Sequence, residues 1–147
     1  MEKLNFLIEY GVENEVFEIA KLIREKVFIE EQNADPDLDV DDNDQISFHF
    51  VGNDKNNNPV CCARVFKDDK GHWIGRIAVL KEFRKMGYAS QLVGFCESYC
   101  WEVLGANTIN IHSQKYIADF YKSFGFKETG LEDIEEGIEH FYLQKNK

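Results

Sequence analysis

The first third of the chain shows two apolar patterns in succession. Residues 4–10 read as a short β-strand. Val16, Ile19, Ile23 and Val27 then recur at three- and four-residue spacing through the segment ENEVFEIAKLIREKVFIEEQ. This spacing gathers their side chains on one face of a helix. The pattern therefore predicts a strand followed by an amphipathic helix.

The next segments have the composition of strands. ISFHFVGND and NPVCCARVFKDD are rich in β-branched and aromatic residues, and DKNNN between them is typical of a turn. HWIGRIAVL continues the series after a second turn, KDDKG. We expect these three strands to form an antiparallel meander.

Beyond the meander the period changes to that of a helix. Leu92, Cys96, Tyr99 and Val103 form a helical stripe that ends near Gly105, a residue suited to close a helix. The segment NTINIHS follows as a strand. Because strand, helix and strand follow in this order, we expect the two strands to be parallel and joined by a right-handed crossover.

The C-terminal part of the chain predicts a shorter helix and two strands. The helix lines one side of KYIADFYKSFGF with Ile117, Phe120 or Tyr121, and Phe124. Gly125 supplies the left-handed residue expected at its end. Strands are expected over residues 126–129 and 138–144. The element order is β-α-β-β-β-α-β-α-β-β, an α/β (α+β) fold with a mixed, mostly antiparallel sheet flanked by helices.

Composition indicates one globular domain over residues 1–147. A chain of 147 residues with 44% hydrophobic positions can bury one substantial core. Its 17 basic and 27 acidic residues give a net charge of −10, which opposes binding to nucleic acid or to an anionic membrane surface. The N-terminal apolar run is too short for a signal peptide, so we expect a cytoplasmic location.

The cysteine pattern favours buried thiols. Cys61, Cys62, Cys96 and Cys100 include no C-x-x-C pair. Adjacent residues of a strand point to opposite faces, so Cys61 and Cys62 are not expected to act together. We therefore expect neither a disulfide nor a metal site from these residues.

The segment RKMGYA joins the third strand of the meander to the long helix. At such a join, unpaired N–H groups and the positive end of the helix dipole suit a phosphate group. Gly87 permits a positive φ, Ala89 leaves room, and the cations Arg84 and Lys85 stand beside them. The P-loop and dinucleotide-binding glycine patterns are both absent from the sequence. The join therefore predicts a site for a pyrophosphate.

The same segment resembles the signature of the GNAT superfamily of acyl-CoA N-acyltransferases. That signature is R/Q-x-x-G-x-G/A after a strand that carries apolar-x-V, here Arg84, Gly87 and Ala89 after Ile77-Ala78-Val79. The segment YIADFYKSFGF resembles the A-x-x-F-Y-x-x-x-G-F segment of the family. The resemblance spans most of the chain.

A finer resemblance concerns the ElaA-like branch of small single-domain bacterial GNAT proteins. It is carried by REKVFIEEQ, DDNDQISFH, Arg64 and EEGIEHFYLQK. SQKYIADFY departs from the A-Q-x-x-A stretch usual in that branch, and this departure concerns the acceptor side rather than the cofactor side.

The resemblance implies that acetyl-CoA binds with its pyrophosphate at the join and its pantetheine arm along the preceding strand. An exposed strand edge can pair with an amide-bearing arm as it pairs with a peptide. A backbone N–H near Val79 could face the thioester carbonyl as an oxyanion donor. The cofactor-binding residues implied are Ile77, Ala78, Val79, Arg84, Lys85, Met86, Gly87, Tyr88, Ala89 and Ser90.

Acetylation of an amine needs two proton-transfer groups. The protonated amine must lose a proton and the leaving thiolate must gain one. The resemblance implies Tyr121 as the acid, with a place in the core as the alternative for this aromatic residue. His112 is the candidate base, because the ordinary pKa of imidazole, ~6.5, suits the task. Glu31 and His140 are the rival bases.

The segment DPDLDVDDND is rich in aspartate and invites a calcium interpretation. In an EF-hand register that starts at Asp35, Val40 stands where glycine is needed and Ile46 where glutamate is needed. The register two residues further on fails in the same way. We expect a solvated loop, with an acidic rim that attracts a cationic amine as the alternative. His49 and His72 show no ligand pattern, and no metal site is predicted.

Together these observations predict an N-acetyltransferase. It would move an acetyl group from the cosubstrate acetyl-CoA directly to a primary amine, with a small molecule as acceptor and without a metal or a covalent enzyme intermediate. The alternative is a non-catalytic module on the same fold that binds acyl-CoA or a partner. A metal-dependent hydrolase is disfavoured by the aspartate spacing. The resemblance leaves a homodimer open.

Overall fold

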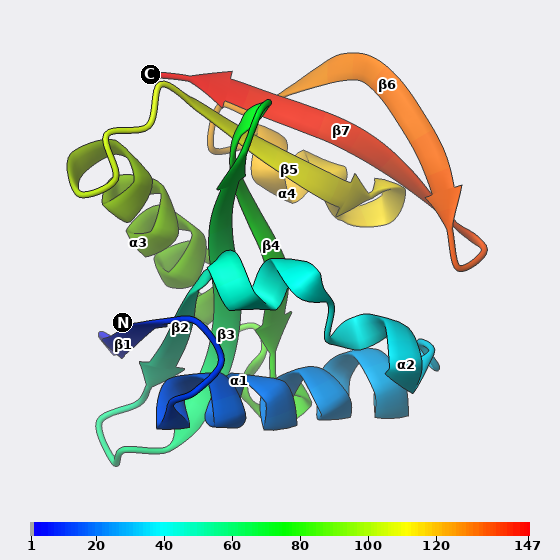
Figure 1. The fold of residues 1–147 in the computed structure, drawn as a ribbon. Helices are drawn as coiled ribbons and strands as arrows, with labels where there is room; N and C mark the ends of the chain where they lie inside the picture. Colours follow the sequence, from blue (N-terminus) through cyan, green and yellow to red (C-terminus); the bar gives the residue numbers. More distant parts are fainter. Residues whose placement is uncertain (1) are drawn as a thin grey trace.

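The computed structural model describes residues 2–147, which build one seven-stranded sheet with helices on both faces (Figure 1). The strands are β1 (Asn5–Tyr10), β2 (Phe48–Asn53), β3 (Pro59–Asp68), β4 (Gly71–Val79), β5 (Thr108–Gln114), β6 (Lys127–Glu135) and β7 (Ile138–Asn146). They lie in the order β1-β2-β3-β4-β5-β7-β6. Every neighbouring pair is antiparallel except β4 and β5. The predicted mixed, mostly antiparallel sheet is confirmed.

The helices follow the predicted order, with one addition. They are α1 (Glu15–Arg24), α2 (Pro36–Asp39), α3 (Tyr88–Glu102) and α4 (Ala118–Lys122). A π-helix, η1 (Glu25–Glu31), continues α1, and short 3₁₀ helices form at η2 (Asp42–Ile46), η3 (Lys81–Phe83) and η4 (Lys115–Ile117). The addition is α2 with η2, in a segment expected to be a loop.

One face of the sheet is covered by α1. The side chain of Asn14 accepts a hydrogen bond from the Phe17 amide at 2.8 Å and thereby starts the helix. The predicted stripe then turns inward, with Val16, Ile23 and Val27 buried. These residues pack on strand positions that include Val51, Cys62 and Ala78.

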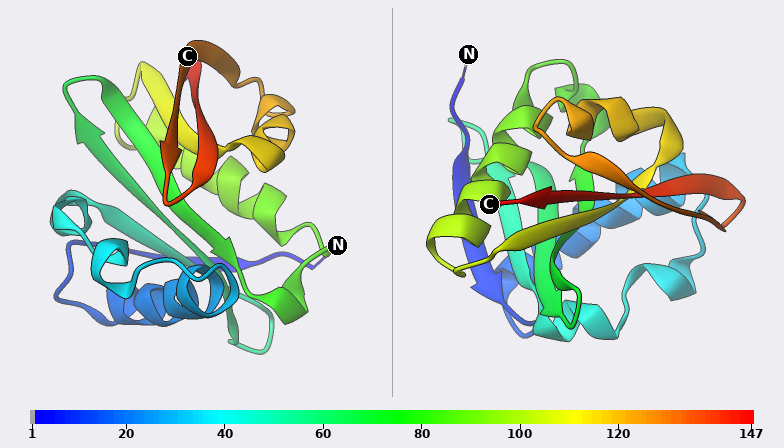
Figure 2. Two further views of the ribbon diagram at one scale, coloured as in Figure 1. Left: turned by 90° about the vertical axis from the view of Figure 1, so that its right-hand side faces the viewer. Right: turned by 90° about the horizontal axis from the view of Figure 1, so that it is seen from above.

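The opposite face is covered by α3 and α4 (Figure 2). Leu92 and Cys96 of α3 are buried, as the stripe predicted, but Val103 is 62% exposed. The stripe was wrong at Val103, which is the C-cap of α3. Cys61 belongs to this core, whereas Cys62 belongs to the core under α1, so the adjacent cysteines do point to opposite faces.

The parallel pair β4 and β5 is joined at one end only. Its paired residues are His72 with Ile109 and Trp73 with Asn110. From there the two strands separate towards the Val79 end of β4. The predicted parallel crossover through α3 is confirmed, and it leaves a gap in the sheet on the side where α3 begins. In the described part of the chain no helix is long and apolar enough to cross a membrane.

The β6–β7 hairpin extends well beyond its predicted length. β6 was expected to end at residue 129 and runs to Glu135. All nine of its residues are exposed, so the strand has no buried face to produce an apolar alternation. A register shift between Glu128 and Glu132 interrupts the pairing further. Glu136 (φ 50°) and Gly137 (φ 78°) close the hairpin in the left-handed conformations that a tight turn needs.

The expectation of a solvated loop at residues 35–44 is wrong for two of its aspartates. Asp39 is 7% exposed and Asp44 is fully buried. Asp44 accepts hydrogen bonds from Arg24 at 2.8 Å and from Arg64 at 3.0 Å, and Arg24 also pairs with Asp39 at 3.2 Å. Buried guanidinium groups need anionic partners, and these carboxylates supply them. The segment is therefore fastened to α1 and β3.

Candidate active site

A cleft of about 980 Å³ lies where β4 and β5 separate. It extends from the beginning of α3 to the β6–β7 hairpin. Twelve of the candidate site residues named from the sequence line it: Ile77, Ala78, Val79, Arg84, Lys85, Gly87, Tyr88, Ala89, Ser90, His112, Tyr121 and His140. Met86 and Glu31 are not among its lining residues. Segments that are far apart in the sequence thus meet around one space.

The turn before α3 presents main-chain donors to this cleft. Lys85 (φ 64°) and Gly87 (φ 79°) both adopt positive φ, which is costly for the lysine and easy for the glycine. Gly87 is the N-cap of α3, and no side chain within residues 2–147 caps the helix there. The first amides of α3 therefore keep their capacity to donate, at the positive end of a 15-residue helix.

Arg84 folds back from this turn towards the strand. Its Nε donates to the Val79 carbonyl at 2.9 Å, and its two terminal nitrogens reach the Glu31 carboxylate at 2.9 and 2.8 Å. The carboxylate of Glu31, a rival candidate for the base, is therefore shared with a guanidinium group. Its role as a base stays a prediction.

β4 is irregular next to the cleft. Its register with β3 shifts between Cys62 and Arg64, and Arg76 adopts φ 48° at this bulge. Beyond the bulge the strand has no pairing with β5 in the described chain. The edge of β4 at residues 77–79 therefore faces the cleft rather than a neighbouring strand.

Tyr121 combines a place in the core with a place at the cleft. It is 5% exposed, so the structural alternative raised for it holds in part. Burial, with Tyr116 adding a smaller effect, raises the pKa of its phenol. The hydroxyl is therefore protonated at neutral pH and able to donate a proton or a hydrogen bond.

The four cysteines take no part in the cleft. All are buried, and burial raises the pKa of Cys61 and of Cys100 to about 12. None of them is among the lining residues. These thiols match the inert, buried class expected from the sequence.

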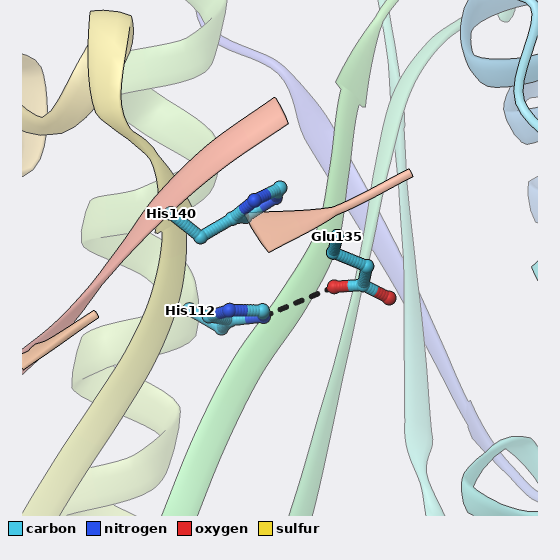
Figure 3. A group of neighbouring side chains, drawn as sticks. All are labelled: His112, Glu135 and His140. Carbon is cyan, nitrogen blue, oxygen red and sulfur yellow. Dashed lines mark ion pairs between the residues drawn. The ribbon is translucent and has the colours of Figure 1, made fainter. Parts of the chain in front are cut away.

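His112 belongs to a group of polar side chains on one face of β5, β7 and β6 (Figure 3). Its Nε2 lies 2.7 Å from Asp133 Oδ1, and its Nδ1 lies 3.3 Å from Glu135 Oε2. Its ring stacks on His140 at 4.4 Å and on Tyr142 at 4.5 Å between centroids. The candidate base thus has carboxylate partners on both sides of its ring.

Sequence reasoning missed Asp133 and Glu135. Both lie in the part of β6 beyond residue 129, where the predicted strand ended. Their spacing of two residues, together with that of His140 and Tyr142, places all four on the same face of a hairpin. That alternation is the signal that could have identified them.

Comparison with known proteins gives consistent results. The family described as acetyltransferase (GNAT) domain matches residues 19–147. A UPF0039 protein of Schizosaccharomyces pombe is 32% identical over 149 residues, which cover 98% of each chain. Protein ElaA of Escherichia coli is 31% identical over 127 residues, which cover 84% of this chain and 82% of ElaA.

Solved structures share the fold over nearly the whole chain. The crystal structure of Escherichia coli ElaA has a TM-score of 0.81 at 26% identity and covers 98% of this chain and 100% of its own. A GNAT family acetyltransferase from Elizabethkingia anophelis, solved with acetyl-CoA bound, has a TM-score of 0.69 at 15% identity, with coverage of 97% and 99%. The match of the family to most of the sequence and these full-length relatives agree. The chain belongs to the GNAT acetyltransferase family, whose chemistry is acyl transfer from acyl-CoA.

Proposed function

We propose that the protein transfers an acetyl group from acetyl-CoA directly to a primary amine of a small molecule. The observation that carries the proposal is the cleft itself. The uncapped beginning of α3, the unpaired edge of β4 and the side chains of His112 and Tyr121 all face one space. Acetyl-CoA bound to a relative of the same fold supports the choice of donor.

The cofactor end would be formed by the turn and the first residues of α3. The amides of residues 87–90 would hold the pyrophosphate, helped by the helix dipole. Arg84 and Lys85 supply positive charge beside them. Arg84 would then exchange at least part of its pairing with Glu31 for a phosphate oxygen.

The arm of the cofactor would lie against β4. Residues 77–79 offer main-chain groups that β5 does not use. Pairing of an amide-bearing arm with such an edge follows the rules of strand addition. The arm would lead from α3 towards Tyr121 and His112.

The reaction requires a proton to leave the amine and another to reach the sulfur. His112 would accept the amine proton as the nitrogen attacks the thioester carbonyl carbon, and its contact with Asp133 would stabilise the charged imidazole. Tyr121 would donate its proton to the sulfur as the C–S bond breaks. The raised pKa of Tyr121 supports a protonated phenol for this step.

The acceptor end supports a cationic amine. Glu135 and Glu136 line the cleft near His112, and the chain carries a net charge of −10. Such a field attracts a protonated amine before it is deprotonated. An acidic rim at residues 35–44 would be extended by the β6–β7 turn, where Glu136 accepts a hydrogen bond from the Asp35 amide at 2.8 Å.

A panel of primary amines, assayed by release of the CoA thiol, tests the proposal. We expect turnover with at least one small amine and none without an amine. Saturable binding of acetyl-CoA in calorimetry without turnover on any amine would instead favour the non-catalytic acyl-CoA-binding module. Absence of both binding and turnover with folded protein would contradict both functions.

A further inference from the structure

Three side-chain atoms that could bind a cation lie close together at the end of the cleft proposed for the amine substrate. His112, Glu135 and His140 each contribute one potential ligand atom, and these atoms all lie within 4.8 Å of one another (Figure 3). They come from β5, β6 and β7, so only the folded sheet brings them together. Their hydrogen bonds determine what can occupy the space between them.

The contacts of His112 leave one ring nitrogen directed at the group. Nε2 lies 2.7 Å from Asp133, whose carboxylate also accepts from the Tyr142 hydroxyl at 2.9 Å. A carboxylate at neutral pH only accepts hydrogen bonds, so Nε2 must carry the proton. Nδ1 is then the nitrogen with a lone pair in the neutral ring, and it lies 3.3 Å from Glu135.

The contacts of His140 lead to the same result. Its Nδ1 lies 2.8 Å from the carbonyl oxygen of Ile138, which can only accept. Nδ1 therefore carries the proton and Nε2 keeps its lone pair. In the neutral rings, two imidazole lone pairs and a carboxylate therefore lie within 4.8 Å of one another with no proton between them, which is unfavourable unless a cation binds there.

We propose that His112, Glu135 and His140 form a binding site for a first-row transition-metal ion, of which Zn²⁺ fits best. Two histidines and one glutamate are a ligand set that holds Zn²⁺ while leaving a further position open. Imidazole ligands favour such ions over Ca²⁺ and Mg²⁺.

His112 and His140 each make a second hydrogen bond, directed away from the group, of the kind found around bound metal ions. A histidine ligand commonly donates its second ring N–H to a carboxylate or a carbonyl, which fixes its tautomer. Asp133 does this for His112, and the Ile138 carbonyl does it for His140. Tyr142 in turn orients Asp133.

Closing the site needs a small movement. Ligands of a tetrahedral Zn²⁺ lie about 3.3 Å apart, given Zn–N distances of about 2.0–2.1 Å. The pair formed by His112 and Glu135 already meets this spacing, at 3.3 Å. The stacked rings of His112 and His140 have to open beyond their 29° interplanar angle, and Glu135, with a side chain 55% exposed, has freedom to follow.

Titration of untagged, metal-free protein with Co²⁺, followed by visible absorption, tests the site. We expect one equivalent of Co²⁺ to bind and to give the d–d absorption bands of a Co²⁺ ion with a low coordination number. Zn²⁺ should displace the Co²⁺, because it binds such ligands more tightly. Glu135→Gln and His140→Ala should each weaken binding at least tenfold. Asp133→Asn should weaken it by about 10–100-fold, because it removes an outer contact.

Glu132→Gln is the matched control, since Glu132 is an exposed carboxylate on the same strand outside the group. It should bind Co²⁺ as the parent does. Circular dichroism of each metal-free variant checks folding, and Glu135→Gln changes an exposed side chain, so it keeps the test valid if His140→Ala unfolds. A parent Kd above about 0.1 mM, equal affinity in all variants, or a thiolate charge-transfer band would overturn the site.

Activity gives a second measurement, which rests on the proposed function. Zn²⁺ would take the lone pair with which His112 accepts the amine proton, so saturating Zn²⁺ should suppress acetyl transfer and a chelator should restore it. The Co²⁺ spectrum does not depend on turnover. Metal binding together with no acetyl transfer by the metal-free protein would therefore contradict the proposed function alone, and transfer by the metal-free protein without any metal binding would contradict this site alone.

Discussion

Two residues of the turn before α3 adopt positive φ for different physical reasons. Gly87 does so at no steric cost, whereas Lys85 is held there at a cost of about 1 kcal/mol or more. Strain of this kind persists where surrounding structure imposes it, often at a ligand site. At the residue scale, we therefore expect the proposed cofactor end to depend on backbone conformation more than on side-chain identity.

Gly87→Ala should impair binding of acetyl-CoA. A Cβ at φ 79° is strained, so the turn will shift and the amides at the beginning of α3 will lose their common direction. We expect the Kd for acetyl-CoA in calorimetry to rise at least tenfold. Gly105→Ala is the control: Gly105 has φ 66° and open space around its Cβ position, and the residue follows the far end of α3. The Gly105→Ala variant should lose about 1 kcal/mol of folding stability and bind acetyl-CoA as tightly as the parent does. Equal Kd values for acetyl-CoA in the two variants would contradict the role of Gly87.

Tyr121→Phe should separate catalysis from binding. The phenol is protonated, and removing it removes a proton donor without removing the buried ring. We expect kcat to fall by about 100-fold, the lower end of general-acid effects, with little change in the Kd for acetyl-CoA. Tyr116→Phe, at an exposed tyrosine that also lines the cleft, should leave kcat unchanged. An unchanged kcat in Tyr121→Phe would remove the assignment.

At the scale of elements, two segments near the cleft have structural roles that their sequence patterns did not predict. The β6–β7 hairpin carries Asp133, Glu135 and His140 to the ring of His112. The segment of α2 and η2 is held on α1 and β3 by buried ion pairs. Both segments are acidic and both line the cleft, yet the carboxylates of Asp133 and Glu135 stay exposed whereas those of Asp39 and Asp44 are buried.

Asp44→Ala should destabilise the fold. The substitution leaves Arg24 and Arg64 buried without a shared anion, and breaking a buried pair in this way costs about 3–5 kcal/mol. Urea unfolding measures the loss. Asp42→Ala, at an exposed aspartate of the same η2 turn, should change stability by less than about 0.5 kcal/mol. Similar losses in both variants would show that the ion pairs do not carry the difference.

The contribution of Asp44 should depend on pH in a defined direction. Burial opposes the charged carboxylate, but hydrogen bonds and charge from Arg24 and Arg64 outweigh burial and lower the pKa of Asp44 from 3.8 to about 2. A lowered folded-state pKa stabilises the protein above the unfolded value and loses this effect as pH falls towards about 2. The stability difference between parent and Asp44→Ala should therefore shrink by about 2 kcal/mol between pH 5 and pH 2, and a constant difference would contradict the assignment.

At the scale of the molecule, the cleft is a consequence of topology. β4 and β5 are the parallel pair, and they are paired at His72 and Trp73 only. α3 crosses between them and begins where they are apart (Figure 1). The gap in the sheet, the helix dipole and the unpaired strand edge therefore coincide at one place.

Acetyl-CoA should stabilise the whole domain. At about 100 times its Kd, a ligand that binds the folded state alone adds about 2.7 kcal/mol, which corresponds to a rise in Tm of roughly 5–10 °C for a chain of this size. Thermal unfolding of the parent with acetyl-CoA, Ca²⁺ or Mg²⁺ measures this. The two ions should produce no rise, because Asp39 and Asp44 are already paired with arginines. A rise in Tm with Ca²⁺ and none with acetyl-CoA would contradict the proposed acetyl-CoA site and indicate a calcium site instead.

Much of the fold could be predicted from local patterns. The stripe of Val16, Ile23 and Val27 and the join at Gly87 are features of neighbouring residues, and the structure retains them. The predictions failed where local pattern and tertiary role differ. β6 has no buried face, so nothing in its apolar pattern marked it as a strand as far as Glu135.

The sequence by itself determined the order of the strands and of helices α1, α3 and α4, the two helical faces that build the cores and the positive φ of Gly87 before α3, because each depends on contacts between near neighbours along the chain. The tertiary structure alone decided that β7 lies between β5 and β6, which brings His112 to Glu135 and His140. It also decided that Asp44 is buried while Asp133 stays exposed and contacts the ring of His112. Whether an aspartate can be buried depends on the charged side chains that tertiary folding brings beside its carboxylate. The sequence pattern around the aspartate does not contain that information.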